Sequence, residues 1–73
     1  MIVLSHYCGD REIEQRHVRT PEEAKAFLRE ENAKAAKQWR WTLARANFVN
    51  DDGTDMEFAA ANAIRRACGQ PEW

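Results

Sequence analysis

A chain of 73 residues leaves room for one hydrophobic core, because it buries only about 60% of its unfolded surface and cannot divide that area between two cores. We therefore expect a single small domain spanning residues 1–73. With 44% hydrophobic and 32% charged residues, the composition is that of a folded globular protein rather than a disordered one. Its net charge of -1 provides no general attraction for nucleic acid or for an anionic membrane.

The first 19 residues predict a β-hairpin. Ile2-Val3-Leu4 and the segment 12–18 flank Gly9-Asp10, and a glycine in first place suits a two-residue type II′ turn. With that turn, His6 lies opposite Ile13. The register then gives the hairpin a core face that carries Ile2, Leu4, His6, Cys8 and Ile13.

The segment Thr20-Pro21-Glu22-Glu23 predicts the start of a helix at Pro21. Threonine can accept a hydrogen bond as the N-cap, proline needs no donor in the first turn, and a carboxylate at the third position closes a capping box. No Gly or Pro follows until Gly53, and the segment 32–46 is rich in good helix formers. The preferred interpretation is one long helix over 21–48. Its apolar stripe is made up of Leu28, Asn32, Ala35, Trp39, Thr42, Ala46 and Val49.

The segment 39–49 also supports a second interpretation, in which the helix ends earlier and a third strand follows. Trp39, Trp41 and Thr42 favour a strand through their β propensity. Against it, the alternation of apolar and polar residues is incomplete, because Arg45 shares a face with Trp41. The fold class is α+β in both cases: ββαα with the long helix, or ββαβα with the third strand.

The last third of the chain predicts a turn followed by a second helix. Asn50-Asp51-Asp52-Gly53 consists of turn-forming residues, and Thr54-x-x-Glu57 is a second capping box. We expect a helix over 54–68 that packs antiparallel to the long one as a helical hairpin, followed by an extended tail over 69–73.

The predicted long helix has a consequence for assembly. A helix of about 28 residues spans roughly 42 Å, whereas a compact globule of this size is only about 29 Å across. The helix would overhang its own domain, and Phe27, Trp41 and Phe48 recur at intervals of seven on a side away from the core stripe. We therefore expect a homodimer in which a second copy covers the overhang.

Histidine and cysteine side chains are the candidates for metal binding or catalysis. His6 and His17 are about 13 Å apart in the predicted hairpin, too far to share an ion. The spacing of His6, Cys8 and Cys68 matches no closed zinc site. We expect no metal site, no cofactor and no catalytic residue. Two cysteines without a signal peptide predict reduced thiols in the cytoplasm, and no apolar run is long enough for a membrane span.

The region around Trp39-Arg40-Trp41 is the best candidate for a functional surface. Trp and Arg are the side chains that most often carry interface energy. On a helix they would lie on different sides, with Trp39 in the core stripe and Trp41 outside it. We expect a non-catalytic protein-binding surface made up of Phe27, Lys34, Lys37, Arg40, Trp41, Arg45 and Phe48.

The expected function is that of a small regulatory or inhibitory protein that binds another protein, of the kind with which a phage or mobile element blocks a host factor. An alternative rests on the four cations, the absence of acids and the two interleaved tryptophans between Asn32 and Asn50. In that alternative the chain is a nucleic-acid-binding or transcription-related module that uses a basic helix face over 34–45.

Overall fold

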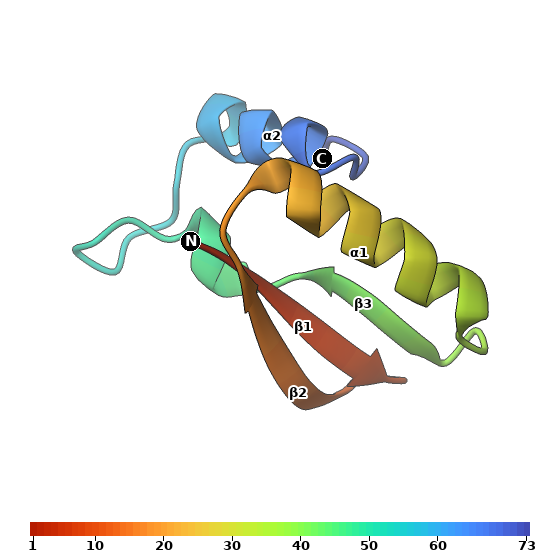
Figure 1. Cartoon of the computed structure of the whole chain (residues 1–73). Coiled ribbons are helices and arrows are strands. Elements are labelled where there is room, and N and C mark those ends of the chain that lie inside the picture. Colours follow the sequence, from red (N-terminus) through yellow and green to blue (C-terminus); the bar gives the residue numbers. More distant parts are fainter.

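A computed structural model of the protein describes all residues, 1–73, and contains a three-stranded antiparallel sheet and two α-helices (Figure 1). The predicted α+β class is therefore confirmed. In chain order the elements are β1 (Ile2–Cys8), β2 (Arg11–Val18), α1 (Pro21–Lys34), β3 (Trp39–Leu43), the 3-10 helix η1 (Arg45–Phe48) and α2 (Phe58–Ala67).

The strands β1 and β2 form the predicted hairpin, and Gly9 turns it with a φ of 64°, a conformation that glycine adopts at little cost. A β-bulge beside His6 then shifts the register, so that His6 pairs with Glu14 and not with Ile13. Ile13 has no partner on β1 and is 43% exposed. Its predicted place in the core is therefore wrong.

Helix α1 begins where the sequence predicts. The Thr20 hydroxyl accepts a hydrogen bond from the N–H of Glu23 at 3.2 Å, and the Glu23 carboxylate accepts one from the N–H of Arg19, also at 3.2 Å. The helix ends at Lys34, and the next residue has an extended backbone. The predicted helix over 21–48 is therefore wrong beyond Lys34.

The alternative third strand is present, over Trp39–Leu43 rather than the whole of 39–49. It pairs antiparallel with β1, with Leu43 opposite Leu4, and gives the sheet order β2-β1-β3. This pairing satisfies the second edge of β1, which a continuous helix would leave open, and it outweighs the local helix propensity. The molecule is also only 34 Å in its longest dimension, shorter than the roughly 42 Å of the predicted helix.

The segment after η1 keeps the predicted turn but shortens the predicted second helix. Gly53 has a φ of 87° within that turn. Thr54 caps no helix, because its N–H and its hydroxyl both donate to the Asp52 carboxylate, at 3.0 and 2.6 Å. Helix α2 spans Phe58–Ala67 instead of 54–68.

Helix α1 covers the face of the sheet that carries Leu4, Trp41 and Leu43, and α2 packs against α1 and η1 (Figure 1). His6 and Cys8, also predicted for the core face, are only partly buried. None of the helices is both long and apolar enough to cross a bilayer. The buried cluster between these elements consists of Leu4, Ala24, Leu28, Trp41, Leu43, Phe48, Ala61 and Cys68.

Two asparagine side chains bind main-chain groups of the sheet. Asn32 of α1 accepts from the N–H of Trp41 at 2.7 Å and donates to its carbonyl at 2.9 Å. Asn47 of η1 accepts from the N–H of Val3 at 2.9 Å and donates to its carbonyl at 2.7 Å. Each amide thus makes the two hydrogen bonds that a residue of a neighbouring strand would make. At Trp41, Asn32 occupies the outer edge of β3.

Candidate protein-binding groove

The aromatic residues expected to form an interface lie in or against the core. Trp41 is 8% exposed and Phe48 is 6% exposed. The partly buried Phe27 ring packs edge-on against Trp41, with 4.9 Å between the ring centroids. The predicted exposed position of Trp41 is therefore wrong.

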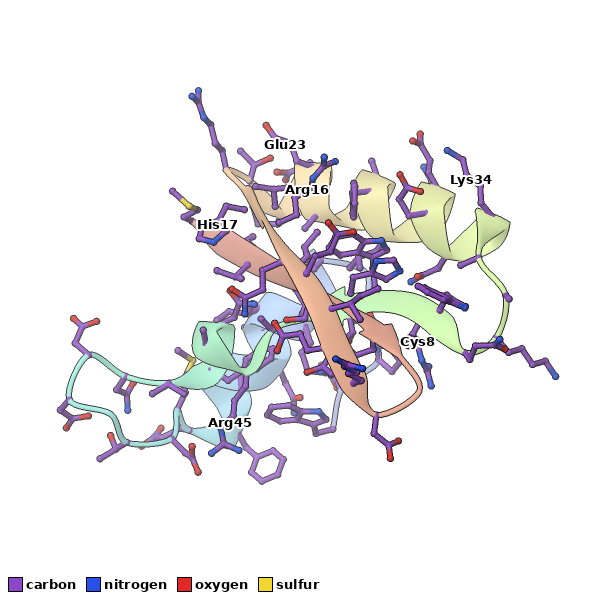
Figure 2. The ribbon with its side chains drawn as sticks, turned by 90° about the horizontal axis from the view of Figure 1, so that it is seen from below. Cys8, Arg16, His17, Glu23, Lys34 and Arg45 are labelled. Carbon is purple, nitrogen blue, oxygen red and sulfur yellow. The ribbon has the colours of Figure 1, made fainter.

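The four cations of the segment 34–45 do not gather on one face. Lys34 and Arg45 lie far apart in Figure 2, because the strand β3 comes between them in the chain. Arg45 forms an ion pair with Asp55 at 2.9 Å. Only Lys37 and Arg40 gather with Trp39, around a shallow hollow of about 420 Å³. The basic helix face over 34–45 is therefore absent.

Trp39 and Trp41 have the reverse of their predicted exposure. Both side chains lie on the same face of β3, because residues two apart in a strand point the same way. Phe27 of α1 covers Trp41, whereas Trp39 lies where the strand begins and is 41% exposed. The core role therefore belongs to Trp41.

A different surface, which we call the aromatic groove, combines depth with exposed aromatic rings. It has a volume of about 440 Å³. Phe58 and Trp73 form part of its wall and are 68% and 60% exposed, respectively. The groove is bounded by Tyr7, Leu43, Arg45, Phe48, Asp55, Met56, Phe58, Arg65 and Trp73.

The position of Trp73 in the groove is set by contacts with α2 and η1. The main-chain N–H of Trp73 donates to the side-chain carbonyl of Asn62 at 2.9 Å, and Arg65 Nε donates to the main-chain carbonyl of Pro71 at 2.6 Å. The indole packs edge-on against Phe48, with 4.9 Å between the ring centroids. These contacts fold residues 70–73 back along α2, so that the predicted tail becomes one wall of the groove.

Of the two arginines that line the groove, only Arg65 carries a charge that no carboxylate of the chain compensates. The Arg65 guanidinium lies over the Trp73 ring, 4.8 Å from its centroid, a distance typical of a cation–π contact. Arg45, labelled in Figure 2, also lines the groove, but the Asp55 carboxylate lies 2.9 Å from its guanidinium and compensates its charge. Arg65 forms no ion pair with a carboxylate of this chain. An apolar wall beside an uncompensated guanidinium can hold an apolar side chain next to a carboxylate.

Beside the groove, the turn at 50–55 carries a perturbed carboxyl group. The two hydrogen bonds from Thr54 lower the pKa of Asp52, because they stabilise its ionised form. This is the bonding expected of a turn, and the carboxylate needs no further role.

Both histidines make contacts within the fold. His6 stacks on Trp41 at 4.5 Å, and its Nδ1 lies 3.1 Å from a Glu14 carboxylate oxygen. His17 belongs to the other face of the hairpin, where its Nδ1 lies 3.0 Å from the sulfur of Met1. No group of three or more His, Cys, Asp or Glu side chains is placed to hold a metal ion.

The thiol of Cys68 is 1% exposed, and its burial, together with the negative charge of Glu22, raises its pKa. A thiol with a raised pKa is a poor nucleophile, because the thiolate is the reactive form.

Comparison of the chain with protein-family models, with curated proteins and with solved structures finds no match. The residues of the aromatic groove are mostly ones that sequence reasoning missed. Of the predicted interface, it contains only Arg45 and Phe48. One signal was available, because Phe58 falls in the predicted second helix but outside its apolar stripe, which is made up of Met56, Ala60, Ala63, Ile64 and Ala67. For Trp73 there was none, since its position depends on Asn62 and Arg65.

Proposed function

We propose that the protein is a non-catalytic protein-binding module and that the aromatic groove receives an apolar segment of another protein. The observation that carries this proposal is the exposure of Phe58 and Trp73, at 68% and 60%, where the two rings lie next to each other in the wall of a formed hollow. Large apolar side chains left in water cost free energy, and burying them against a partner recovers it.

The composition of the groove suits a protein partner. Trp, Tyr and Arg are the residues most often found at energetic centres of protein interfaces, and Trp73, Tyr7 and Arg65 all line the groove. The Trp73 ring is already held by contacts with Phe48 and Arg65, so little side-chain entropy is lost when a partner binds. The segment that fits best carries an apolar side chain for the hollow and a carboxylate for Arg65.

A regulatory or inhibitory role, of the kind that phage or mobile-element proteins exert on a host protein, remains part of the proposal. One small domain with a single aromatic groove suits binding that blocks or adjusts a larger partner. The cytoplasm is the proposed compartment, and the free thiols of Cys8 and Cys68 support a reducing environment.

Nucleic-acid binding is a second candidate, supported by one specific observation. Trp39 is 41% exposed and shares a hollow with Lys37 and Arg40, so a base could stack on the indole while the cations contact phosphate. With only two cations at the hollow, binding of this kind would be weak and sensitive to salt.

Affinity capture from a bacterial lysate, with and without nuclease treatment, separates the two candidates. We expect protein partners to survive nuclease and to be lost with Phe58→Ala and with Trp73→Ala. The matched control is Trp39→Ala, which removes an exposed aromatic residue outside the groove and should leave capture unchanged. Thermal unfolding of each variant confirms that the fold is kept.

The opposite pattern would contradict the proposal. Capture that disappears with nuclease, with Trp39→Ala or with the combined Lys37→Ala and Arg40→Ala changes, while Phe58→Ala has no effect, would favour the nucleic-acid module.

A further inference from the structure

The outer edge of β2 is the open edge of the sheet. In Figure 1, β2 is the lowest strand, with β1 and β3 above it and no element below. All residues of β2 except Val18 are exposed. The opposite edge, on β3, is covered by Asn32 at its centre. An open edge of eight residues is long enough to pair with another strand.

Hydrogen bonding within the sheet shows which groups of β2 face outward. The carbonyl of Val3 accepts from the N–H of Ala44, so the main-chain groups of Val3 point toward the β3 side of β1. Successive residues of a strand alternate in this direction, and the main-chain groups of Leu4 therefore point toward β2. Leu4 pairs with Arg16, whose main-chain groups therefore point inward. The N–H and C=O groups of Gln15 and His17, on either side of Arg16, point to solvent.

We propose that a second copy of this chain pairs with β2 along this edge, antiparallel and with the two-fold axis at Gln15. The two three-stranded sheets then join into one sheet of six strands. Gln15 lies opposite the partner's Gln15 and exchanges two main-chain hydrogen bonds with it. A two-fold interface of this kind uses the same surface of both copies.

Charge complementarity selects this register. With the axis at Gln15, Glu14 lies opposite the partner's Arg16, and Arg16 lies opposite the partner's Glu14, so each dimer gains two pairs of opposite charge. Moving the axis by one residue shifts the pairing by two residues, which keeps the hydrogen-bonding pattern. The axis then lies at Glu14, opposite the partner's Glu14, or at Arg16, opposite the partner's Arg16. Both shifted registers place like charges together at the centre of the interface.

The surroundings of these two side chains leave them available. Glu14 has one carboxylate oxygen 3.1 Å from His6, and its other oxygen has no partner in the chain. The Arg16 guanidinium lies 4.9 Å from the centroid of the Phe27 ring and forms no ion pair. In Figure 2, Arg16 is seen reaching toward α1. The contact with Phe27 holds the charge in place while its N–H donors remain free.

The bulge in β2 sets the length of the proposed ladder. The unpaired residue Ile13 lies between Arg11 and the proposed axis at Gln15 and interrupts the regular strand there. Arg11 is therefore not held against the partner's Arg19 in this register. The charged edge therefore disfavours open-ended stacking, as charges on natural edge strands do, while permitting one self-complementary register.

This dimer replaces the one expected from the sequence. The predicted dimer depended on a helix over 21–48 that overhangs the domain, and α1 ends at Lys34. The edge of β2 is also separate from the aromatic groove, to which β2 contributes no residue. A dimer through β2 therefore leaves both grooves open.

Sedimentation equilibrium tests the assembly. We expect the mass of the wild-type protein to rise with concentration from 8.5 kDa toward twice that value. The change Gln15→Pro should keep the protein monomeric, since proline removes an N–H that faces outward and leaves the bonds to β1 in place. Phe58→Ala is the control and should dimerise like the wild type.

Charge exchange tests the register. Glu14→Arg and Arg16→Glu should each be monomeric alone, because each puts like charges opposite one another. An equimolar mixture of the two should form a heterodimer, and the double variant should recover the homodimer. If a single variant fails to fold by circular dichroism, the double variant and Gln15→Pro still decide. A wild-type protein that stays monomeric at millimolar concentration, or a dimer that Gln15→Pro leaves intact, would overturn the proposal.

Discussion

Trp41 is the side chain on which the packing of the sheet against α1 depends. Its indole stacks on His6 at 4.5 Å on one side and meets the edge of Phe27 at 4.9 Å on another. Asn32 binds its main-chain groups as well. One residue thus joins β1, β3 and α1.

Replacing Trp41 should therefore unfold the protein far more readily than replacing Trp39. We expect Trp41→Ala to lower the free energy of unfolding by about 3–5 kcal/mol, as for large core truncations. Trp39→Ala should cost about 1 kcal/mol, because that ring is already 41% exposed. Urea unfolding of both variants measures the difference. Equal losses would show that the two rings share one buried environment.

The two thiols should differ in reactivity for a physical reason. Cys68 is 1% exposed and has a raised pKa, whereas Cys8 is only partly buried. We expect iodoacetamide to modify Cys8 in the native protein and Cys68 only after unfolding. Mass spectrometry of the time course, with Cys8→Ser as the control, checks this. Modification of Cys68 at the rate of Cys8 under native conditions would contradict its burial.

The raised pKa of Cys68 also predicts a loss of stability in alkali. The folded state holds the thiol proton more tightly than the unfolded state does. Stability is therefore kept below the ordinary pKa of a thiol and falls as the pH rises above it. Urea unfolding at a series of alkaline pH values should show this fall for the wild type and a shallower one for Cys68→Ala. Parallel curves would assign the alkaline loss to other groups.

At the level of elements, asparagine amides complete the sheet where strands are missing. Asn32→Ala would leave the N–H and C=O of Trp41 unpaired, and we expect a loss of about 1–3 kcal/mol. The control is Asn62→Ala. Asn62 also lies in a helix, but its side chain accepts only from the main-chain N–H of the exposed residue Trp73. This substitution should change the free energy of unfolding by less than about 0.5 kcal/mol. Similar effects of both changes in thermal or urea unfolding would show that Asn32 does not hold β3.

The elements that could be predicted from the sequence are those determined by neighbouring residues. Thr20 and Glu23 cap α1 as expected, and Gly9 turns the hairpin. The bulge at Ile13 could not be predicted, since it depends on pairing along the whole of β1 and β2. The end of α1 could not be predicted either, because residues 39–43 pair with the second edge of β1 instead of continuing the helix.

The hydrogen bonds of the asparagine side chains could not be predicted from the sequence for a related reason. Asn32 falls in the apolar stripe of the predicted long helix, and nothing in its local sequence indicates that its amide binds a strand. The candidate site was missed in the same way. Phe58 and Trp73 are distant in sequence and meet only after residues 70–73 fold back along α2.

At the scale of the whole molecule, the core cluster and the proposed binding groove share Leu43 and Phe48 and differ in their other residues. The core cluster lies between the sheet and the helices, whereas the aromatic groove lies at the surface, where Phe58 and Trp73 remain largely exposed. A change at Phe58 or Trp73 is therefore expected to weaken the proposed binding while the fold is kept. The open edge of β2, where we propose that a second copy pairs, is a third region and contributes no residue to the groove.

Site-specific photocrosslinking tests the central claim, binding of another protein in the aromatic groove. A benzophenone amino acid is placed at residue 58 and, in a separate variant, at residue 39, so that each exposed aromatic site reports on its own surroundings. After irradiation in a nuclease-treated bacterial lysate, we expect a discrete protein adduct from position 58 and none from position 39. Adducts from position 39 alone, or equal labelling from both positions, would contradict a protein-binding role for the groove.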